Sequence, residues 1–509
     1  MKKTLIMLLA CTALFSCKDN EKQEEAEQKE EQKTIAPVSN DALESAVIYE
    51  ANIRQYSPEG TFNAFTEDIP QLKELGVKVI WLMPVYPISM KNRKATGDLS
   101  VEDIEDPEER EKYLGSYYAI SDYTDVNPEF GDFEDFEKLV ETAHENGMYV
   151  ILDWVANHTG WDHKWIDENP DFYTQNEKGE VVDPLNPDTG ESWGWTDVAD
   201  LNYDNKELWT AMSNEMKFWV EEYNIDGFRA DVAGEVPTEF WEQVTSEMRE
   251  DHEIFMLAES EDKDLFHNAF DMGYNWEGHH IMNEMAQGKK SAKDWDAYMQ
   301  KIDSTYQEDD YLMNFVTNHD ENSWNGTVEE RMGDASETML ALTYTLPGVP
   351  LIYSGQEYDM DKRLLFFEKD SIPKTKGKVW PLLQKLGTLK NENKALHGAK
   401  NAASYQEIET SDEENILAFK REKDGAELIY IANMSDENTT FSIKMDGNFE
   451  DYLSGDTIEI SKDKNMDLKP WQYFILIISN KFTKLLKTAL SKGLFLLVIN
   501  RKRFSFLVN

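Results

Sequence analysis

From residue 46 onward, short and mostly apolar segments alternate with stretches that have a helical pattern of apolar positions. The segment 77–85 is apolar almost without interruption, which is typical of a parallel strand covered on both faces. The stretch 205–223 instead predicts a helix with one buried face. Its apolar residues at helical spacing are Leu208, Met212, Met216 and Trp219. The candidate strands lie at 47–54, 77–85, 149–155, 225–232, 254–259, 270–274, 312–317 and 349–354. Strands that alternate with helices in this number predict an α/β fold, a (β/α)8 or TIM barrel, over residues 46–395.

Two insertions interrupt this alternation. The segment 158–203 follows the third strand, is polar and rich in Trp, Asp, Asn and Pro, and predicts a small excursion domain over the barrel mouth. The acid-rich segment 91–114 follows the second strand and predicts a surface loop with no assigned role. After a last helix near 379–393, apolar and polar residues alternate, which predicts a C-terminal antiparallel β-domain over 396–478.

Both ends of the chain have the composition of segments outside the fold. Residues 1–17 form a basic and then apolar segment, shorter than the roughly 20 residues that span a bilayer, and predict an export signal. Its end, Leu14-Phe15-Ser16-Cys17, resembles a bacterial lipobox, so we expect a lipid on Cys17 and attachment to the outer membrane; a plain cleaved signal is the alternative. Residues 18–45 predict an acidic tether. The basic segment 479–509 predicts a disordered or read-through extension, or an interfacial amphipathic helix.

Composition narrows the functional classes. The 509 residues are 40% hydrophobic, enough for a large folded body with more than one domain. The net charge of −48 would repel a polyanion, so we do not expect a nucleic-acid partner. Both cysteines, Cys11 and Cys17, precede residue 18, so the body has neither a disulfide framework nor a thiolate metal site.

Charged and polar residues follow several of the predicted strands, where a barrel carries its active site. The ends of these strands read Asp153-Trp-Val-Ala-Asn157-His158, Gly-Phe-Arg229-Ala-Asp231, Ala-Glu259, Asn-His319-Asp320 and Gly-Gln-Glu357. When acids crowd together, one has its pKa raised, while an arginine holds another ionised. One proton donor and one ionised nucleophile are what acetal cleavage requires.

These motifs, in this order, resemble the four signature regions of the α-amylase family, glycoside hydrolase family 13. The signature regions match Asp153-x-x-x-Asn157-His158, Gly227-Phe228-Arg229-x-Asp231, Glu259 and Phe315-x-x-Asn318-His319-Asp320. The segment 199–202 resembles a further motif of the family in the excursion domain, and 348–357 resembles its motif at strand eight. The resemblance covers about residues 46–478.

The resemblance implies a retaining glycoside hydrolase that acts on α-glucan. Asp231 would be the nucleophile, Glu259 the acid and then the base, and Asp320 the group that favours the distorted sugar ring. A retaining pair of this kind lies about 5–5.5 Å apart. Substrate binding would fall to Tyr118, Asp153, His158, Arg229 and His319, with Tyr118 stacking on a sugar ring.

The resemblance also implies a structural calcium ion. Its ligands would be Asn157, Asp200 and the backbone carbonyl of Glu235. Many family members carry Lys-His where this chain has Gly234 and Glu235, so the contacts to the leaving group, and with them the preferred chain length, are left open.

The excursion contains four tryptophans that are either sugar platforms or the core of this small domain. They are Trp161, Trp165, Trp193 and Trp195.

Several functions remain open at this point. An α-amylase acting on starch-like glucans or malto-oligosaccharides competes with a glucanotransferase, a neopullulanase-like or cyclomaltodextrinase-like enzyme, and an isomerase, since all share the covalent intermediate. The segment 18–45 is too short for the extra N-terminal β-domain of neopullulanase-like relatives, which favours an endo-acting α-amylase. A non-catalytic glucan-binding protein would be expected to lack at least one of the three acids, and all three are present.

Overall fold

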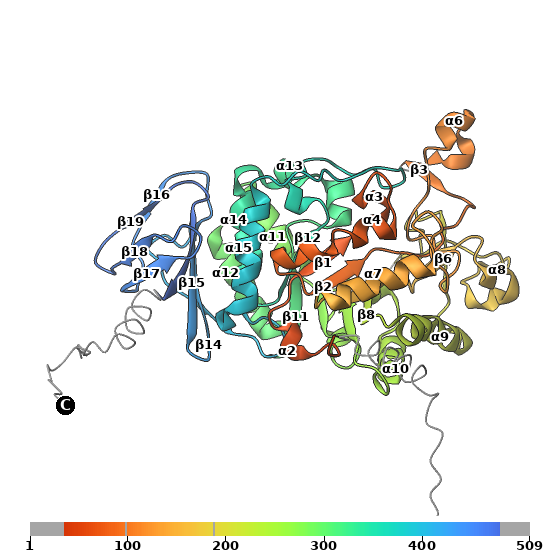
Figure 1. Cartoon of the computed structure of the whole chain (residues 1–509), viewed down its shortest axis with the longest axis horizontal. Coiled ribbons are helices and arrows are strands. Elements are labelled where there is room, and N and C mark those ends of the chain that lie inside the picture. Colours follow the sequence, from red (N-terminus) through yellow and green to blue (C-terminus); the bar gives the residue numbers. More distant parts are fainter. Residues whose placement is uncertain (1–34, 97–98, 187–188, 479–509) are drawn as a thin grey trace, which may run out of the picture. The chain divides into compact units, whose positions relative to one another are not determined.

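The computed structural model describes residues 35–96, 99–186 and 189–478. The predicted signal with Cys17, most of the tether and the basic segment 479–509 lie outside the described residues. Eight parallel strands close into a barrel in the order β1-β12-β11-β10-β9-β8-β5-β2, which confirms the predicted TIM barrel (Figure 1). The strands are β1 (Ile48–Ala51), β2 (Val79–Leu82), β5 (Tyr149–Trp154), β8 (Gly227–Ala230), β9 (Phe255–Ala258), β10 (Met272–Tyr274), β11 (Tyr311–Asn314) and β12 (Val349–Tyr353).

Helices connect the barrel strands. The longer ones are α7 (Phe133–Glu145), α9 (Lys206–Tyr223), α10 (Thr238–Arg249), α11 (Trp276–Ala286), α12 (Ala292–Thr305), α14 (Ser336–Thr345) and α15 (Val379–Glu392). The short ones are α3 (Ile53–Tyr56), α4 (Phe62–Thr66), α5 (Ile69–Leu72) and α13 (Val328–Met332). The predicted apolar stripe of α9 is buried, and Asn205 caps the first turn of this helix. No helix in the described part of the chain combines the length and the hydrophobicity that crossing a membrane requires.

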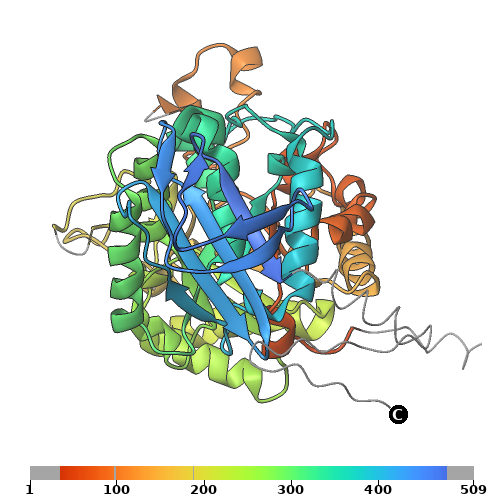
Figure 2. The same cartoon turned by 90° about the vertical axis from the view of Figure 1, so that its left-hand side faces the viewer.

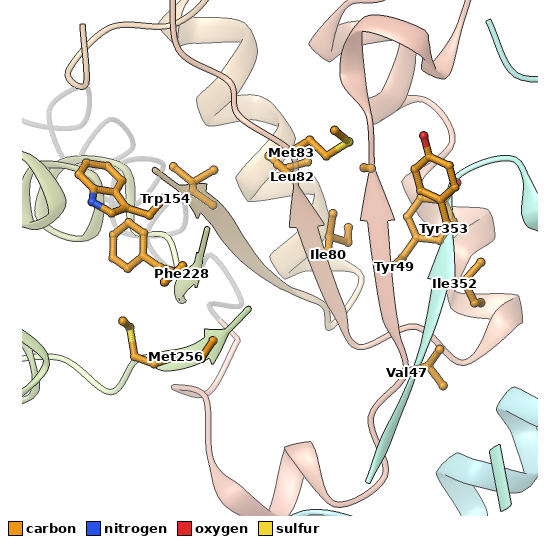
Figure 3. Packing of buried hydrophobic residues seen from close by; sticks show 14 of the residues in the cluster. Val47, Tyr49, Ile80, Leu82, Met83, Trp154, Phe228, Met256, Ile352 and Tyr353 are labelled. Atoms are coloured by element: carbon orange, nitrogen blue, oxygen red, sulfur yellow. The ribbon is translucent and has the colours of Figure 1, made fainter. Parts of the chain in front are cut away.

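Alternating positions along the barrel strands have different tasks. Side chains such as Tyr49, Trp154 and Phe228 are buried in one large hydrophobic cluster (Figure 3). Tyr49 stacks on Phe65 of α4 at 6.3 Å between ring centroids, so this set of positions packs against the helices. The positions in between carry polar groups that meet one another, because Arg229 of β8 bonds to Asp153 of β5 inside the barrel. Figure 3 shows the apolar set on β1, β2, β5, β8, β9 and β12.

Both insertions contain secondary structure. In the excursion, β6 (His158–Gly160) pairs antiparallel with β7 (Val198–Asp200), and α8 (Lys164–Glu168) lies between them in sequence. The segment 91–114 is more than the expected loop, since it contains β3 (Lys94–Thr96) paired with β4 (Leu99–Ser100), followed by α6 (Pro107–Arg110).

The C-terminal β-domain is also confirmed (Figure 2). Its main sheet has the order β13-β14-β15-β20-β17-β18, and β16 pairs with β19. The strands are β13 (Ser404–Glu407), β14 (Ile416–Lys423), β15 (Ala426–Asn433), β16 (Thr439–Phe441), β17 (Gly447–Asp451), β18 (Thr457–Ile460), β19 (Met466–Leu468) and β20 (Tyr473–Ile478). One face of β14 and β15, with Phe419 and Tyr430, joins the core of the barrel, and the Tyr430 hydroxyl donates to the Thr338 carbonyl of α14 at 3.0 Å. The other face, with Ile416 and Ile429, forms a separate small core.

The folded body begins earlier than residue 46. The helix α2 (Asn40–Leu43) is capped by Ser39, and Leu43 is buried. The carboxylate of buried Glu44 accepts hydrogen bonds from the backbone of Ala399 at 3.1 Å and of Asn401 at 2.5 Å. The end of the expected tether, from Ser39 onward, is therefore part of the fold, because these contacts hold it against the chain that follows α15.

Candidate active site

The three predicted catalytic acids stand at the carboxyl ends of barrel strands. Asp231 and Glu259 directly follow β8 and β9, and their backbone N–H groups extend the ladder by bonding to Trp154 and Ala230 at 2.9 and 3.0 Å. Asp320 lies in the connection after β11 and immediately precedes a π-helical turn, Glu321–Asn325. The barrel thus holds two of the acids on rigid strand ends and the third on a short loop.

A single buried guanidinium joins the acids of this centre. Arg229 donates from Nη1 to Asp153 Oδ1 and to Asp231 Oδ1, both at 2.8 Å. Its Nη2 lies 3.0 Å from Glu259 Oε2, but the contact lacks hydrogen-bond geometry. The side chain of Arg229 has no exposed surface, so these buried carboxylates compensate its positive charge in place of water. The predicted pairing of Arg229 with Asp231 is therefore present, and Arg229 acts on two further acids.

The environment of Glu259 suits a proton donor. Burial, together with the charges of Asp231 and Asp320, raises the pKa of Glu259 to about 8, although Arg229 opposes this shift. One carboxylate oxygen accepts a hydrogen bond from the backbone N–H of Val232 at 2.8 Å. At neutral pH the carboxyl therefore keeps its proton in the folded protein.

The backbone that carries this donor is strained. Val232 has φ = 37°, a left-handed conformation that a β-branched residue rarely adopts. It directly follows Asp231, and its N–H faces Glu259. Strain of this kind is typical of functional sites, where the surrounding structure holds a group in place. Here it fixes Asp231 and Glu259 relative to each other.

Asp153, which the sequence predicts to bind substrate, is buried among other residues of the centre. Its side chain is completely buried, and Oδ2 accepts hydrogen bonds from Trp81 Nε1 at 3.2 Å and from the Tyr118 hydroxyl at 3.1 Å. The other oxygen is held by Arg229. Because both oxygens are occupied and shielded, Asp153 positions the arginine, the tryptophan and the tyrosine of the centre.

His319 is held by an acid that the sequence analysis missed. Glu50 of β1 is completely buried, and its Oε1 lies 2.5 Å from His319 Nδ1. The opposite ring nitrogen lies 2.8 Å from the Tyr118 hydroxyl and 3.3 Å from Asp320 Oδ2. Burial lowers the pKa of His319, but the carboxylates of Asp320 and Glu50 outweigh it and raise the pKa to about 9. The only signal for Glu50 is an acid within the otherwise apolar strand Ile48-Tyr49-Glu50-Ala51.

Tyr118 and His158 also lie at this centre. The ring of Tyr118 stacks against His319, with 5.5 Å between centroids. Burial lowers the pKa of His158 to about 4, so this ring is neutral. The centroid of this ring lies 5.9 Å from that of Trp195, which connects the centre to the excursion domain.

The tryptophans of the excursion fall into both predicted classes. Trp165 is buried in the core, with 4% of its surface exposed, and Trp161 is half-buried. Trp193 is 42% exposed and stacks on Trp195 at 5.9 Å. Trp165 thus belongs to the core, whereas the stacked pair Trp193 and Trp195 is the candidate sugar platform.

The residues expected to bind calcium come from three neighbouring segments. The Leu201 N–H donates to the Asn157 carbonyl at 3.1 Å, which fixes the end of β7 beside the end of β5. Burial raises the pKa of Asp200 to about 6, and the nearby carboxylates of Asp183 and Glu235 add to the shift. In the described residues no group of three or more His, Cys, Asp and Glu side chains is arranged around a common metal position. An amide, one carboxylate and a backbone carbonyl are oxygen donors and fit a hard cation.

Comparisons with known proteins agree with this geometry. The α-amylase MalA of Haloarcula japonica is 24% identical over 423 residues, which cover 81% of this chain and 59% of that protein. The 4-α-glucanotransferase of Thermotoga neapolitana is 29% identical over 332 residues, which cover 59% of this chain and 68% of that protein. A maltogenic α-amylase, AmyB from Thermotoga neapolitana, superposes with a TM-score of 0.75 at 26% identity, covering 86% of this chain and 99% of that chain.

The family model matches most of the chain. The chain spans 59% and 64% of the length of two α-amylase relatives that it matches, from Haloarcula japonica and Dictyoglomus thermophilum. The family model of the α-amylase catalytic domain matches residues 21–425. That range contains every acid of the barrel centre described above, and the chain therefore belongs to the α-amylase family, glycoside hydrolase family 13.

Proposed function

We propose that the protein is a retaining glycoside hydrolase that cleaves α-1,4-glucosidic bonds in starch-like glucans or malto-oligosaccharides. The observation that carries the proposal is that one arginine donates a hydrogen bond to only one of two neighbouring acids. Asp231 accepts a hydrogen bond from Arg229 at 2.8 Å, whereas Glu259 lacks such a bond and has its pKa raised to about 8 by burial. One acid is prepared as an anion and the other as a proton donor, which are the two roles of a retaining glycosidase.

In the first step a carboxylate oxygen of Asp231 forms a bond to the anomeric carbon. The bond from that carbon to the glycosidic oxygen breaks, and the proton of Glu259 passes to the departing oxygen. In the second step Glu259 takes a proton from water, the water oxygen attacks the anomeric carbon, and the bond to Asp231 breaks. Asp320 and the protonated His319 lie beside each other, so they offer an acceptor and a donor to the same sugar.

The test is the time course of product anomers from maltoheptaose by NMR. We expect the α-anomer to appear first, with activity lost in Asp231→Asn and Glu259→Gln. Asp264→Asn is the control, because Asp264 is an exposed acid on the connection that follows Glu259. Release of the β-anomer, or equal rates for the protein and for Asp231→Asn, would overturn the proposal. Products longer than the substrate would identify a glucanotransferase, since transfer uses the same intermediate with a sugar hydroxyl in place of water.

We further propose that calcium binds between the barrel and the excursion domain through Asn157, Asp200 and the Glu235 carbonyl. The raised pKa of Asp200, with acidic neighbours and no arginine or lysine among the causes of the shift, supports a cation there. A bound cation would join the excursion to the barrel and stabilise both. Isothermal titration of the chelator-treated protein with Ca²⁺ tests this, and heat of binding that persists in Asp200→Asn would contradict it.

We also propose that the mature protein carries a lipid on Cys17 and is attached to the outer membrane. The support is the lipobox-like sequence before Cys17 and the acidic segment that follows it. Mass spectrometry of the mature N-terminus distinguishes a lipidated Cys17 from a plain cleaved end.

A further inference from the structure

Two rows of aromatic rings lead from the catalytic centre to solvent. The first row runs from His158 through Trp195 to Trp193, with 5.9 Å at each step. The second row starts at His319, whose ring stacks on Tyr118 at 5.5 Å. Each row therefore begins at one of the two histidines that border the acids.

The second row continues to another exposed tryptophan. The ring of Phe366 lies nearly parallel to that of Tyr118, at 9° and 6.4 Å. Trp324 packs on Phe366 at 5.1 Å and on Phe367 at 6.0 Å, and 50% of its surface is exposed. Trp324 belongs to the π-helical turn that immediately follows Asp320. An indole that contacts two phenylalanines and has half of its surface exposed offers an apolar surface to a ligand.

The two rows start on opposite sides of the barrel. His158 follows β5 and His319 follows β11, and these strands stand four positions apart in the closed ring of eight. The strands that carry Asp231 and Glu259, β8 and β9, are neighbours within that ring. A chain that stacks on Trp193 and on Trp324 would therefore pass over the catalytic acids.

The insertion 91–114, which had no assigned role, contacts both rows. Lys94 Nζ donates to the carbonyl of Gly194, the residue between Trp193 and Trp195, at 2.5 Å. At its other end the Leu114 N–H donates to the Phe367 carbonyl at 2.7 Å. The insertion thus contacts both aromatic rows, at Lys94 and at Leu114.

We propose that Trp324, supported by Phe366, is a binding platform for a glucose unit beyond the catalytic one, on the side of the centre opposite Trp193. The ligand is an α-1,4-linked oligosaccharide whose apolar pyranose face stacks on the indole. This proposal rests on the proposed function and adds to it that substrate is held on both sides of the acids. Such binding selects long chains and internal bonds over short substrates.

The experiment measures binding without turnover, in the Glu259→Gln background. Calorimetry gives the affinity for maltoheptaose and for 1-deoxynojirimycin, a mimic of a single sugar ring. Trp324→Ala is expected to bind maltoheptaose about tenfold more weakly, as the loss of one stacked ring implies, and the single-ring mimic with unchanged affinity. Trp324→Tyr restores most of the affinity, since a tyrosine ring also stacks.

The controls separate the two proposals. Ile478→Ala removes an exposed apolar side chain in the C-terminal sheet and should leave both affinities unchanged. If Trp324→Ala binds maltoheptaose like its parent, or loses the single-ring mimic as well, the platform is refuted while α-glucan binding stands. If the parent itself does not bind maltoheptaose, the proposed function fails first. Trp193→Ala should weaken maltoheptaose binding independently, so that the two fold-changes multiply in the double variant.

Discussion

Replacing Glu259 by glutamine should stabilise the folded chain at alkaline pH while it removes the catalytic acid. Burial raises the pKa of Glu259 to about 8 in the folded protein, whereas a glutamate in an unfolded chain has a pKa of about 4.3. Below the lower value the carboxyl is neutral in both states, and its titration costs no stability. As the pH rises, the unfolded chain ionises while the folded chain keeps its proton, so the free energy of unfolding falls by about 1.4 kcal/mol per pH unit.

Above pH 8 this loss is complete and amounts to roughly 5 kcal/mol. Glutamine does not titrate, so the variant escapes the loss. Its gain in stability over the parent should therefore be small at pH 5 and large at pH 9.

The assay is thermal unfolding of parent and variant at both pH values. Constant effects of the substitution on packing cancel when the change in Tm at pH 5 is subtracted from that at pH 9. We expect the remainder to be positive and to reach a few °C. Asp264→Asn corrects for the loss of one negative charge on the same connection, because Asp264 is exposed. A gain that is equal at both pH values, or larger at pH 5, would show that Glu259 is ionised in the folded protein and would refute its assignment as the acid.

Three further measurements test the surroundings of the centre. In the parent, kcat/KM should fall above about pH 8, where Glu259 loses its proton. Glu50→Gln keeps an oxygen acceptor but removes one of the charges that raise the pKa of His319, so His319 should lose its proton at a lower pH and the alkaline limb should become steeper. Glu357→Gln, at an equally buried carboxylate that bonds to the Tyr49 hydroxyl instead, should leave that limb in place. Chelation of metal should lower Tm in the parent but not in Asp200→Asn, and an equal loss in both would exclude a cation at that residue.

The fold was predictable because the barrel depends on features that are local in sequence. Segments such as 77–85 and 149–155 are mostly apolar, since one set of side chains packs under the helices and the other fills the barrel. The strands found are shorter than these segments, because the residues that follow them still look apolar but turn into the loops of the mouth. The start of the body was placed too late for a related reason. Glu44 reads as part of an acidic tether, and only contacts more than 350 residues away in sequence show that it is buried.

The site was predictable where the acids end a strand and not where they lie within one. Asp231 and Glu259 stand out because the apolar pattern stops at them. Glu50 does not, because its role depends on its distance from His319, which belongs to the other half of the chain. The aromatic row to Trp324 was missed for the same reason, since it combines rings from three separate connections. Asp153 was recognised by its position, but only its burial shows that it positions other groups.

The charge balance around Arg229 also explains how Glu259 can serve as an acid and then as a base without moving. While Asp231 is an anion, its charge contributes to the raised pKa of Glu259 and favours the protonated acid. Once Asp231 is esterified to the sugar, that charge is gone. The guanidinium lies 3.0 Å from Glu259, and of its two other carboxylate partners only Asp153 is then still a carboxylate. Both changes lower the pKa of Glu259 in the intermediate, so the same carboxylate that has given up its proton stays ionised long enough to activate water.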